Sequence, residues 1–239
     1  MSSGHHTFEL GDISFDVTRK RIKNIYLRVC LPQGRVAISA PMRMSLETIR
    51  LFSISKLGWI RKQQEKLKHQ TREMPKEYID HEPHDYLGRK YELKIVETKG
   101  ASEVILKQDT LELHIRKKTS VIQKKQVMQG WYKQQLKLFV SQYVLKLEKI
   151  MNVTVAEVCV RTMKTRWGTC NVKAKRIWLN TELAKKSIES IEYIITHEMV
   201  HLLEPSHNKK FKVYMDTFLP QWRVLKQALN QSALGYVEP

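Results

Sequence analysis

The segment His197-Glu198-Met199-Val200-His201 constrains the fold of this chain more than any other. Two histidines four residues apart lie one above the other on a helix, so both imidazoles can reach a single ion. Glu198 follows the first histidine directly, projects beside such an ion and can take a proton from a bound water molecule. The pattern therefore predicts a helix over about 190–203 that carries a metal site on one face.

A third histidine, His207, follows six residues after His201. Pro205 disfavours helical backbone at Glu204, so we expect the helix to end there and the chain to turn His207 back toward the first two rings. Three protein nitrogens with one coordination position left for water are typical of a catalytic zinc ion rather than a structural one. The sequence therefore predicts that these three histidines bind Zn²⁺, or another divalent metal ion, and that Glu198 is the general base.

Before residue 120 the chain has the pattern of strands with one helix. Residues that alternate between apolar and polar, or short apolar runs between turn signals, predict strands at 25–31, 36–38, 91–96, 104–106 and 111–115, with a turn at Pro32–Gly34. Ser45 is expected to cap a helix that runs to about Lys68. No internal repeat is evident in the sequence.

From residue 121 the apolar residues recur every three or four positions, which predicts a long amphipathic helix to about Ile150. Strands are expected at 153–161 and 176–180, and helices at 190–203 and 208–219. The fold class expected is therefore α+β, with a strand-rich part at 1–120 and a hydrolase domain at 121–239 that meet near residues 117–122.

Three segments of the C-terminal half occur together in a characteristic order: Thr165-Arg166-Trp167-Gly168-Thr169-Cys170, Ile177-Trp178-Leu179-Asn180, and the 197–207 segment with Phe211 behind it. In order and spacing they resemble the YgjP-like metallopeptidase family, which is related to the SprT-like zinc proteases. Ala40-Pro41, Trp59-Ile60 and residues 86–91 also resemble that family. Thr169 stands where the family usually has Ser.

The resemblance implies a zincin-like core, in which the HExxH helix packs beside a small antiparallel sheet with strand 177–180 nearest the cleft. It also implies that His197, His201 and His207 are zinc ligands and that Glu198 is the base. Trp167-Gly168 is expected to form a hairpin packed on the core rather than a platform for substrate, because a glycine beside an aromatic residue suits a tight turn, and Cys170 is expected to pack rather than to react.

The net charge of the chain does not decide between several classes of substrate. The chain has 42 Lys and Arg against 24 Asp and Glu, a formal net charge of +18 spread over both halves, and such a charge attracts polyanions. Three classes are compatible: a metallopeptidase, a nucleoside triphosphate pyrophosphatase, and a DNA-associated protease or nucleic-acid-binding module. Lys164 and Arg166 are candidates for substrate binding, and with Lys173, Lys175 and Arg176 they predict a basic surface at the zinc cleft.

Three widely spaced cysteines without a CxxC pair indicate a reducing compartment, so we expect a cytoplasmic protein. No apolar run approaches the roughly 20 residues of a membrane-spanning helix, and the first residues have no secretory signal. His81 and His84, on either side of Pro83, are weaker candidates for a second metal site.

Overall fold

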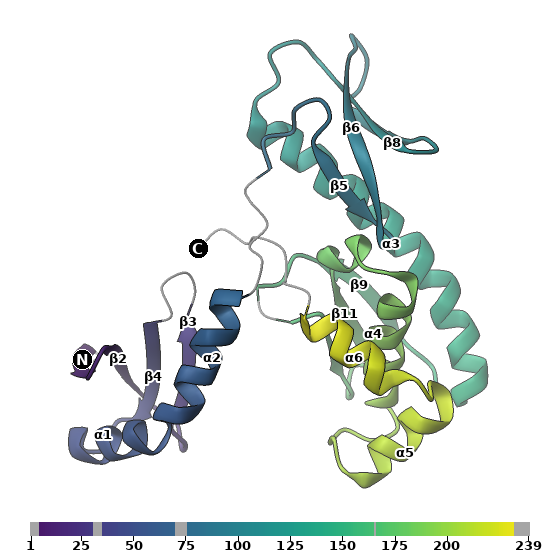
Figure 1. The fold of residues 1–239 in the computed structure, drawn as a ribbon. Helices are drawn as coiled ribbons and strands as arrows, with labels where there is room; N and C mark the ends of the chain where they lie inside the picture. The colour runs from purple at the N-terminus through teal and green to yellow at the C-terminus, as the bar shows by residue number, and fades with distance from the viewer. Residues whose placement is uncertain (1–4, 31–34, 70–75, 165, 232–239) are drawn as a thin grey trace. The chain divides into compact units, whose positions relative to one another are not determined.

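The computed structural model describes residues 5–30, 35–69, 76–164 and 166–231 (Figure 1). The chain forms two compact units, which comprise residues 1–71 and 72–239. The turn expected at Pro32–Gly34 lies outside the described residues. No helix among the described ranges combines the length and the apolar composition that crossing a membrane requires.

The first unit is a four-stranded sheet with two helices on one face. Its strands are β1 (His5–Leu10), β2 (Ile13–Lys20), β3 (Tyr26–Cys30) and β4 (Arg35–Pro41), in the spatial order β1-β2-β4-β3. Helices α1 (Leu46–Ser55) and α2 (Leu57–His69) contribute Ile49 and Ile60 to a core with Val17 and Ile38 of the strands. Ser45 caps α1 as expected, but the helix breaks at Lys56 instead of continuing to residue 68.

The second unit begins with another four-stranded sheet. Its strands are β5 (Pro83–Tyr86), β6 (Arg89–Glu97), β7 (Glu103–Leu106) and β8 (Thr110–Ile115), in the order β5-β6-β8-β7. Helix α3 (Val121–Met151) begins at a capping box formed by Ser120 and Gln123 and runs along this sheet and into the rest of the unit (Figure 1). Leu93, Leu111 and Leu113 of the sheet share one core with α3.

Because of this shared core, the boundary between the two units differs from the one expected from the sequence. The sequence analysis places it near residues 117–122, whereas the units divide between Thr71 and Arg72. The strands of 83–115 have no separate core of their own, because their buried residues pack against Met128, Tyr132 and Leu136 of α3. The sheet therefore belongs with the helix that follows it.

The two four-stranded sheets have the same topology, although no repeat is evident in the sequence. In each, an antiparallel hairpin is followed by a parallel central pair and a second antiparallel pair. Gly11 and Gly88 both adopt positive φ, at 62° and 79°, in the first hairpin turns. Because burial constrains only every second strand residue to be apolar, the two sheets can share a backbone with few identical side chains.

The rest of the second unit contains a three-stranded sheet and three helices. The strands are β9 (Glu157–Arg161), β10 (Gly168–Asn171) and β11 (Arg176–Asn180), in the order β10-β11-β9. A 3₁₀ helix, η1 (Thr181–Lys185), is followed by α4 (Ile188–Val200), α5 (Lys209–Phe218) and α6 (Trp222–Gln231). The expected antiparallel sheet is instead mixed, because the chain crosses from β9 to the far side of β11 before it forms β10, so β9 and β11 are parallel.

The turn between β5 and β6 lies against the start of α4. Leu87 N–H donates to the carbonyl of Ala184, and a Cβ on Gly88 would lie 2.9 Å from Ser187 Cα. Ser187 is the residue whose hydroxyl caps α4. The close approach of two backbones therefore requires glycine at this position.

We expect Gly88→Ala to lower the free energy of unfolding by about 1–3 kcal/mol, because alanine is strained at positive φ and its Cβ meets backbone. Gly130→Ala is the matched control, since a Cβ at this position of α3 meets nothing within 4 Å. That control should raise stability by about 0.5–1 kcal/mol. Urea titration measures both, and equal stability of the two variants would contradict the required close approach.

Candidate metal centre

Helix α4 carries the first part of the site. Ser187 caps its start by accepting a hydrogen bond from Ser190 N–H, and eight of the residues from Ile191 to Val200 are buried. The helix ends at Val200, earlier than the expected end near Glu204, and His201 is its C-cap. Shorter-range bonds from Leu202 and Leu203 N–H to the carbonyls of Met199 and Val200 then turn the chain. The turn begins before Pro205, so the proline follows the helix end rather than setting it.

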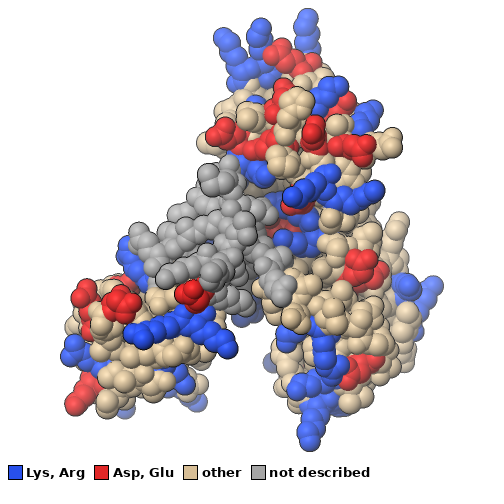
Figure 2. Space-filling model, viewed as in Figure 1, with Lys and Arg blue, Asp and Glu red and all other residues tan. Residues whose placement is uncertain are grey.

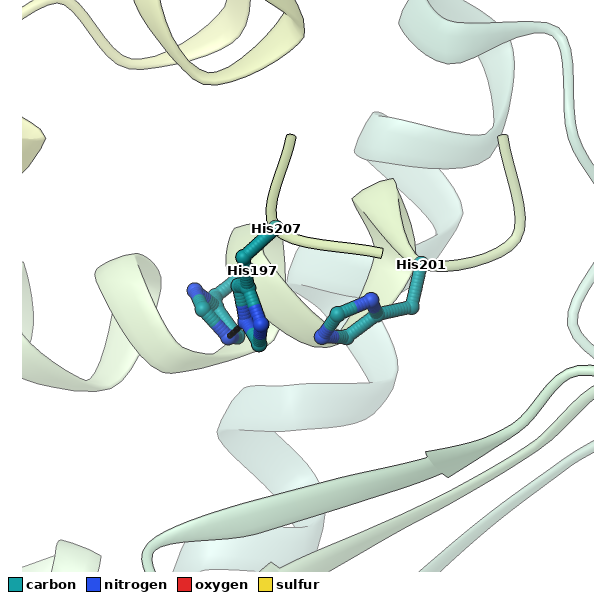
Figure 3. A group of neighbouring side chains, drawn as sticks. All are labelled: His197, His201 and His207. Carbon is teal, nitrogen blue, oxygen red and sulfur yellow. Dashed lines mark hydrogen bonds between the residues drawn. The ribbon is translucent and has the colours of Figure 1, made fainter. Parts of the chain in front are cut away.

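The three histidines lie together, as Figure 3 shows. One ring nitrogen from each lies within 4.8 Å of the other two. The Nε2 atoms of His197 and His207 are 3.0 Å apart, and the ring centroids of His201 and His207 are separated by 4.7 Å. His197 and His201 are half-buried, whereas His207 is exposed. The three rings thus form a cluster with one side open to solvent.

Phe211 lies behind the cluster. Its buried ring has its centroid 5.0, 4.9 and 4.7 Å from those of His197, His201 and His207. Asn208 caps α5 by accepting from Phe211 N–H, which anchors this ring one turn after His207. His201 Nδ1 lies 3.3 Å from the carbonyl of Glu204, so Nδ1 carries the proton and Nε2 is the free lone pair. These contacts orient the rings from outside the cluster.

The donor set fits a divalent metal ion of borderline softness such as zinc. Burial, with smaller contributions from the neighbouring histidines, lowers the pKa of His197 to about 3, and burial also lowers the pKa of His201. Both rings are therefore neutral at pH 7, which is the form that binds metal. Two tetrahedral ligands about 2.0–2.1 Å from one zinc ion lie about 3.3 Å from each other. The 3.0 Å between Nε2 of His197 and of His207 is close to that spacing.

Glu198 lies on the sheet side of the cluster, against β10. A Cβ on Gly168 would lie 2.8 Å from both Cγ and Oε1 of Glu198, so only glycine leaves room for this carboxyl group. Burial raises the pKa of Glu198 to about 8, and the positive charge of Arg166 opposes that shift. Glu198 is 6% exposed, so it is desolvated next to the three rings. Trp167-Gly168 belongs to a hairpin packed on the core, as expected, because Gly168 begins β10 of the β10–β11 hairpin and Trp167 packs against the core.

Asn180 holds the loop between β9 and β10. Its buried side-chain amide donates to the carbonyls of Met163 and Arg166 at 2.8 and 2.9 Å. Its Oδ1 accepts from the N–H groups of Met163 and Glu182. Residue spacing predicts neither the hydrogen bonds of Asn180 nor the contact of Gly168 with Glu198, because both depend on which segments the fold brings together. The family motif contains the two residues but does not indicate what they contact.

The structure separates the five cations of the expected basic cleft. Arg166 is exposed on the loop that Asn180 holds, and its charge acts on Glu198; Lys164 is exposed on the same loop. Lys173 and Lys175 lie in the turn between β10 and β11, at the opposite end of the hairpin from Gly168, and Arg176 forms an ion pair with Glu157. On the face drawn in Figure 2, Lys and Arg are scattered over both units among Asp and Glu.

The other sequence candidates have structural partners. Burial, together with the charge of Glu198, raises the pKa of Cys170 to about 11, so its half-buried side chain is a packed thiol. His84 bonds to Glu82 at 2.8 Å and His81 to Glu92 at 3.3 Å. Among the described residues, only the cluster of His197, His201 and His207 brings three potential ligands together. No second metal site therefore forms at His81 and His84.

Comparisons with known proteins identify a family. The model of the YgjP-like family, described as a metallopeptidase domain, matches residues 23–232. No match was found among curated proteins. The crystal structure of the metallopeptidase zymogen abylysin of Pyrococcus abyssi aligns at 19% identity over 38% of this chain and 90% of its own, with a TM-score of 0.36. That of the zymogen jannalysin of Methanocaldococcus jannaschii aligns at 22% identity over 40% and 94%, with a TM-score of 0.34.

We expect Asn180→Ala to lower the free energy of unfolding by about 1–3 kcal/mol, because it leaves several backbone groups of the 163–166 loop without partners. Asn171→Ala is the matched control, since Asn171 is exposed and bonds only Ala174 N–H in the next turn. Urea titration of the two variants checks the difference, and an Asn180 variant as stable as the control would show that water replaces these bonds.

Proposed function

The chain belongs to the YgjP-like metallopeptidase family, and from this premise we propose that it is a zinc-dependent peptidase. We assign His197, His201 and His207 as the zinc ligands and Glu198 as the general base. The observation that carries the proposal is the convergence of three imidazoles, of which the two on α4 are neutral through burial, beside one buried carboxyl group. A zinc ion there would acidify a water molecule and polarise the carbonyl oxygen of the substrate.

The protein's own groups have separable tasks in this proposal. Glu198 accepts the proton of the attacking water and passes it to the amine that leaves. Its burial favours this role, because a pKa raised from the ordinary carboxyl range toward neutrality suits both acceptance and release of a proton. Arg166 supplies a positive charge close to Glu198, and we propose that it and Lys164 bind the substrate backbone or an acidic group beside the scissile bond.

The sheet provides a place for an extended peptide. β10 is an edge strand, and no other described strand pairs with its outer side. Gly168, its first residue, lies against Glu198, so a peptide that pairs with β10 would pass the three histidines. Strand addition of this kind takes its affinity from main-chain hydrogen bonds and accepts many side chains.

A peptide substrate is favoured over the nucleotide alternative by the placement of charge. Three of the five cations expected at the cleft lie at the far end of the β10–β11 hairpin or in an ion pair. Of the five cations, only Lys164 and Arg166 lie on the loop beside Glu198, so the basic cleft expected for a triphosphate is present only in part. A cytoplasmic location remains part of the proposal and is supported by three free cysteines.

We expect the zinc-loaded protein to hydrolyse members of a peptide panel, and Glu198→Gln to reduce turnover about 10²–10⁴-fold while zinc content stays the same. His201→Ala should lose both zinc and the thermal stability that zinc binding adds by mass action. Glu189→Gln, on the exposed first turn of α4, is the matched control and should keep activity.

Turnover, metal analysis and thermal unfolding measure these effects. Equal loss of zinc from the Glu198 and His201 variants would make Glu198 a ligand instead of the base. Hydrolysis confined to a nucleoside triphosphate panel would reassign the substrate.

Gly168→Ala should reproduce the Glu198→Gln phenotype. The new Cβ meets only the flexible end of the Glu198 side chain, so the protein should fold and bind zinc while the carboxyl group is displaced. A displacement of about 1 Å costs up to about a hundredfold in rate. Gly100→Ala, whose Cβ makes an ordinary contact 3.4 Å from Thr98 Oγ1, is the control for turnover and zinc content. Normal turnover of Gly168→Ala would contradict the need for close contact.

A further inference from the structure

The sheet of the first unit has one face that its own helices do not cover. Helices α1 and α2 pack on the face formed by Val17, Val36 and Ile38. Side chains alternate along a strand, so the residues between these point to the opposite side, the open face. Thr18, Ser39 and Tyr26 form one row across it, since Thr18 pairs with Ser39 and Ser39 with Tyr26.

The open face is cationic at one end. Residues 17–46 contain seven Lys and Arg and no Asp or Glu. Lys20 ends β2 on this face, and Arg28 lies two residues after Tyr26 on β3. The Lys20 carbonyl accepts from Met42 N–H, so the loops after β2 and after β4 meet at the same end. Lys20, Arg21, Lys23 and Arg43 are exposed at this end, and Arg28 is exposed further along the sheet, opposite Ala37.

None of these five cations forms an ion pair with any residue that the structure describes. The sheet of the second unit has the same topology and provides an internal comparison. On its equivalent face, Glu112 bonds to Lys94 at 3.4 Å and to His114 at 3.3 Å. Glu103, the first residue of β7, takes the position that Tyr26 has in β3. The open face of the first unit has one acidic residue on its central strands, Asp16, in the row of Ala37 and Arg28, but none of the five cations pairs with it, whereas Lys94 pairs with Glu112 on the equivalent face of the second unit.

Tyr26 adds a second chemical feature. Its side chain is 59% exposed, although a tyrosine on a sheet is normally packed by neighbours. Residues across the sheet from it are small, with Ser39 opposite and Ala37 next to Arg28. A flat ring can therefore lie on Tyr26 without meeting a large side chain. Arg28 lies about 7 Å further along the strand, and its planar guanidinium group can also stack.

We propose that this open face binds a single-stranded nucleic acid, with a base stacked on Tyr26 and phosphates at Lys20, Arg21, Lys23, Arg28 and Arg43. An exposed aromatic ring within a cationic field is the combination that binds single strands without sequence preference. An acidic peptide would use the charges but not the ring, and a duplex keeps its bases stacked internally. The residues of this face belong to the first unit and the histidine cluster to the second, and the proposal does not depend on the proposed hydrolysis.

The test measures binding of the full-length protein to fluorescein-labelled oligothymidylate and oligouridylate of about 12 nucleotides by anisotropy at several salt concentrations. Tyr26→Ala should weaken binding about five- to a hundredfold, whereas Tyr26→Phe should retain affinity because its ring still stacks. The double substitution Lys20→Ala and Lys23→Ala should reduce the slope of log affinity against log salt by about 0.7 for each phosphate that the variant no longer neutralises.

Two controls match these variants. Trp59→Ala removes a 46% exposed ring from α2, on the other side of the sheet, and Lys94→Ala removes an exposed lysine from the equivalent face of the second unit. Both should bind as the unaltered protein does. The proposal is overturned if neither oligonucleotide binds at low salt, or if Tyr26→Ala binds as tightly as Trp59→Ala. Equal or tighter binding of a 12-residue polyglutamate peptide, or of a duplex of the same length, would also overturn it.

Discussion

The packing of three imidazole rings around Phe211 is the contact on which the second unit depends. It joins the end of α4, the loop before α5 and the first turn of α5 into one arrangement. Burial that makes His197 and His201 neutral also makes them good ligands, so one environment provides both packing and chemistry. The burial of α4 after its first turn holds these rings at fixed positions.

The small sheet completes the site in two ways. Its strand β10 leaves room for Glu198, and its strand β11 holds the loop before β10. Because Gly168 has no side chain, the carboxyl group of Glu198 can lie against the edge of β10. The side chain of Asn180 makes three hydrogen bonds that hold the loop that carries Arg166, and a fourth that caps η1. The crossover that makes the sheet mixed is the same loop, so the strand directions and the position of Arg166 have one origin.

The two four-stranded sheets share one backbone topology but differ in the residues on their uncovered faces. Their topologies agree, and each packs one apolar face against helices. Their other faces differ, since Glu112 pairs with Lys94 on one, whereas Tyr26, Lys20 and Arg28 occupy the other without an ion pair among the described residues. A sheet face that is free of core packing can change its charge at little cost in stability, so its composition reflects its surroundings.

The sequence by itself determined the helix that carries His197 and His201, the cap at Ser45, and most strands of the two larger sheets. Local spacing and capping chemistry act within a few residues, which is why they can be read directly. Residues 83–115 were assigned to the wrong unit, because the core they share with α3 depends on long-range packing. Only the tertiary structure decided that Gly168 faces Glu198, that Asn180 holds the 163–166 loop and that Lys173, Lys175 and Arg176 lie away from the histidines. Each of these depends on which distant segments pack together, and residue spacing along the chain does not encode that.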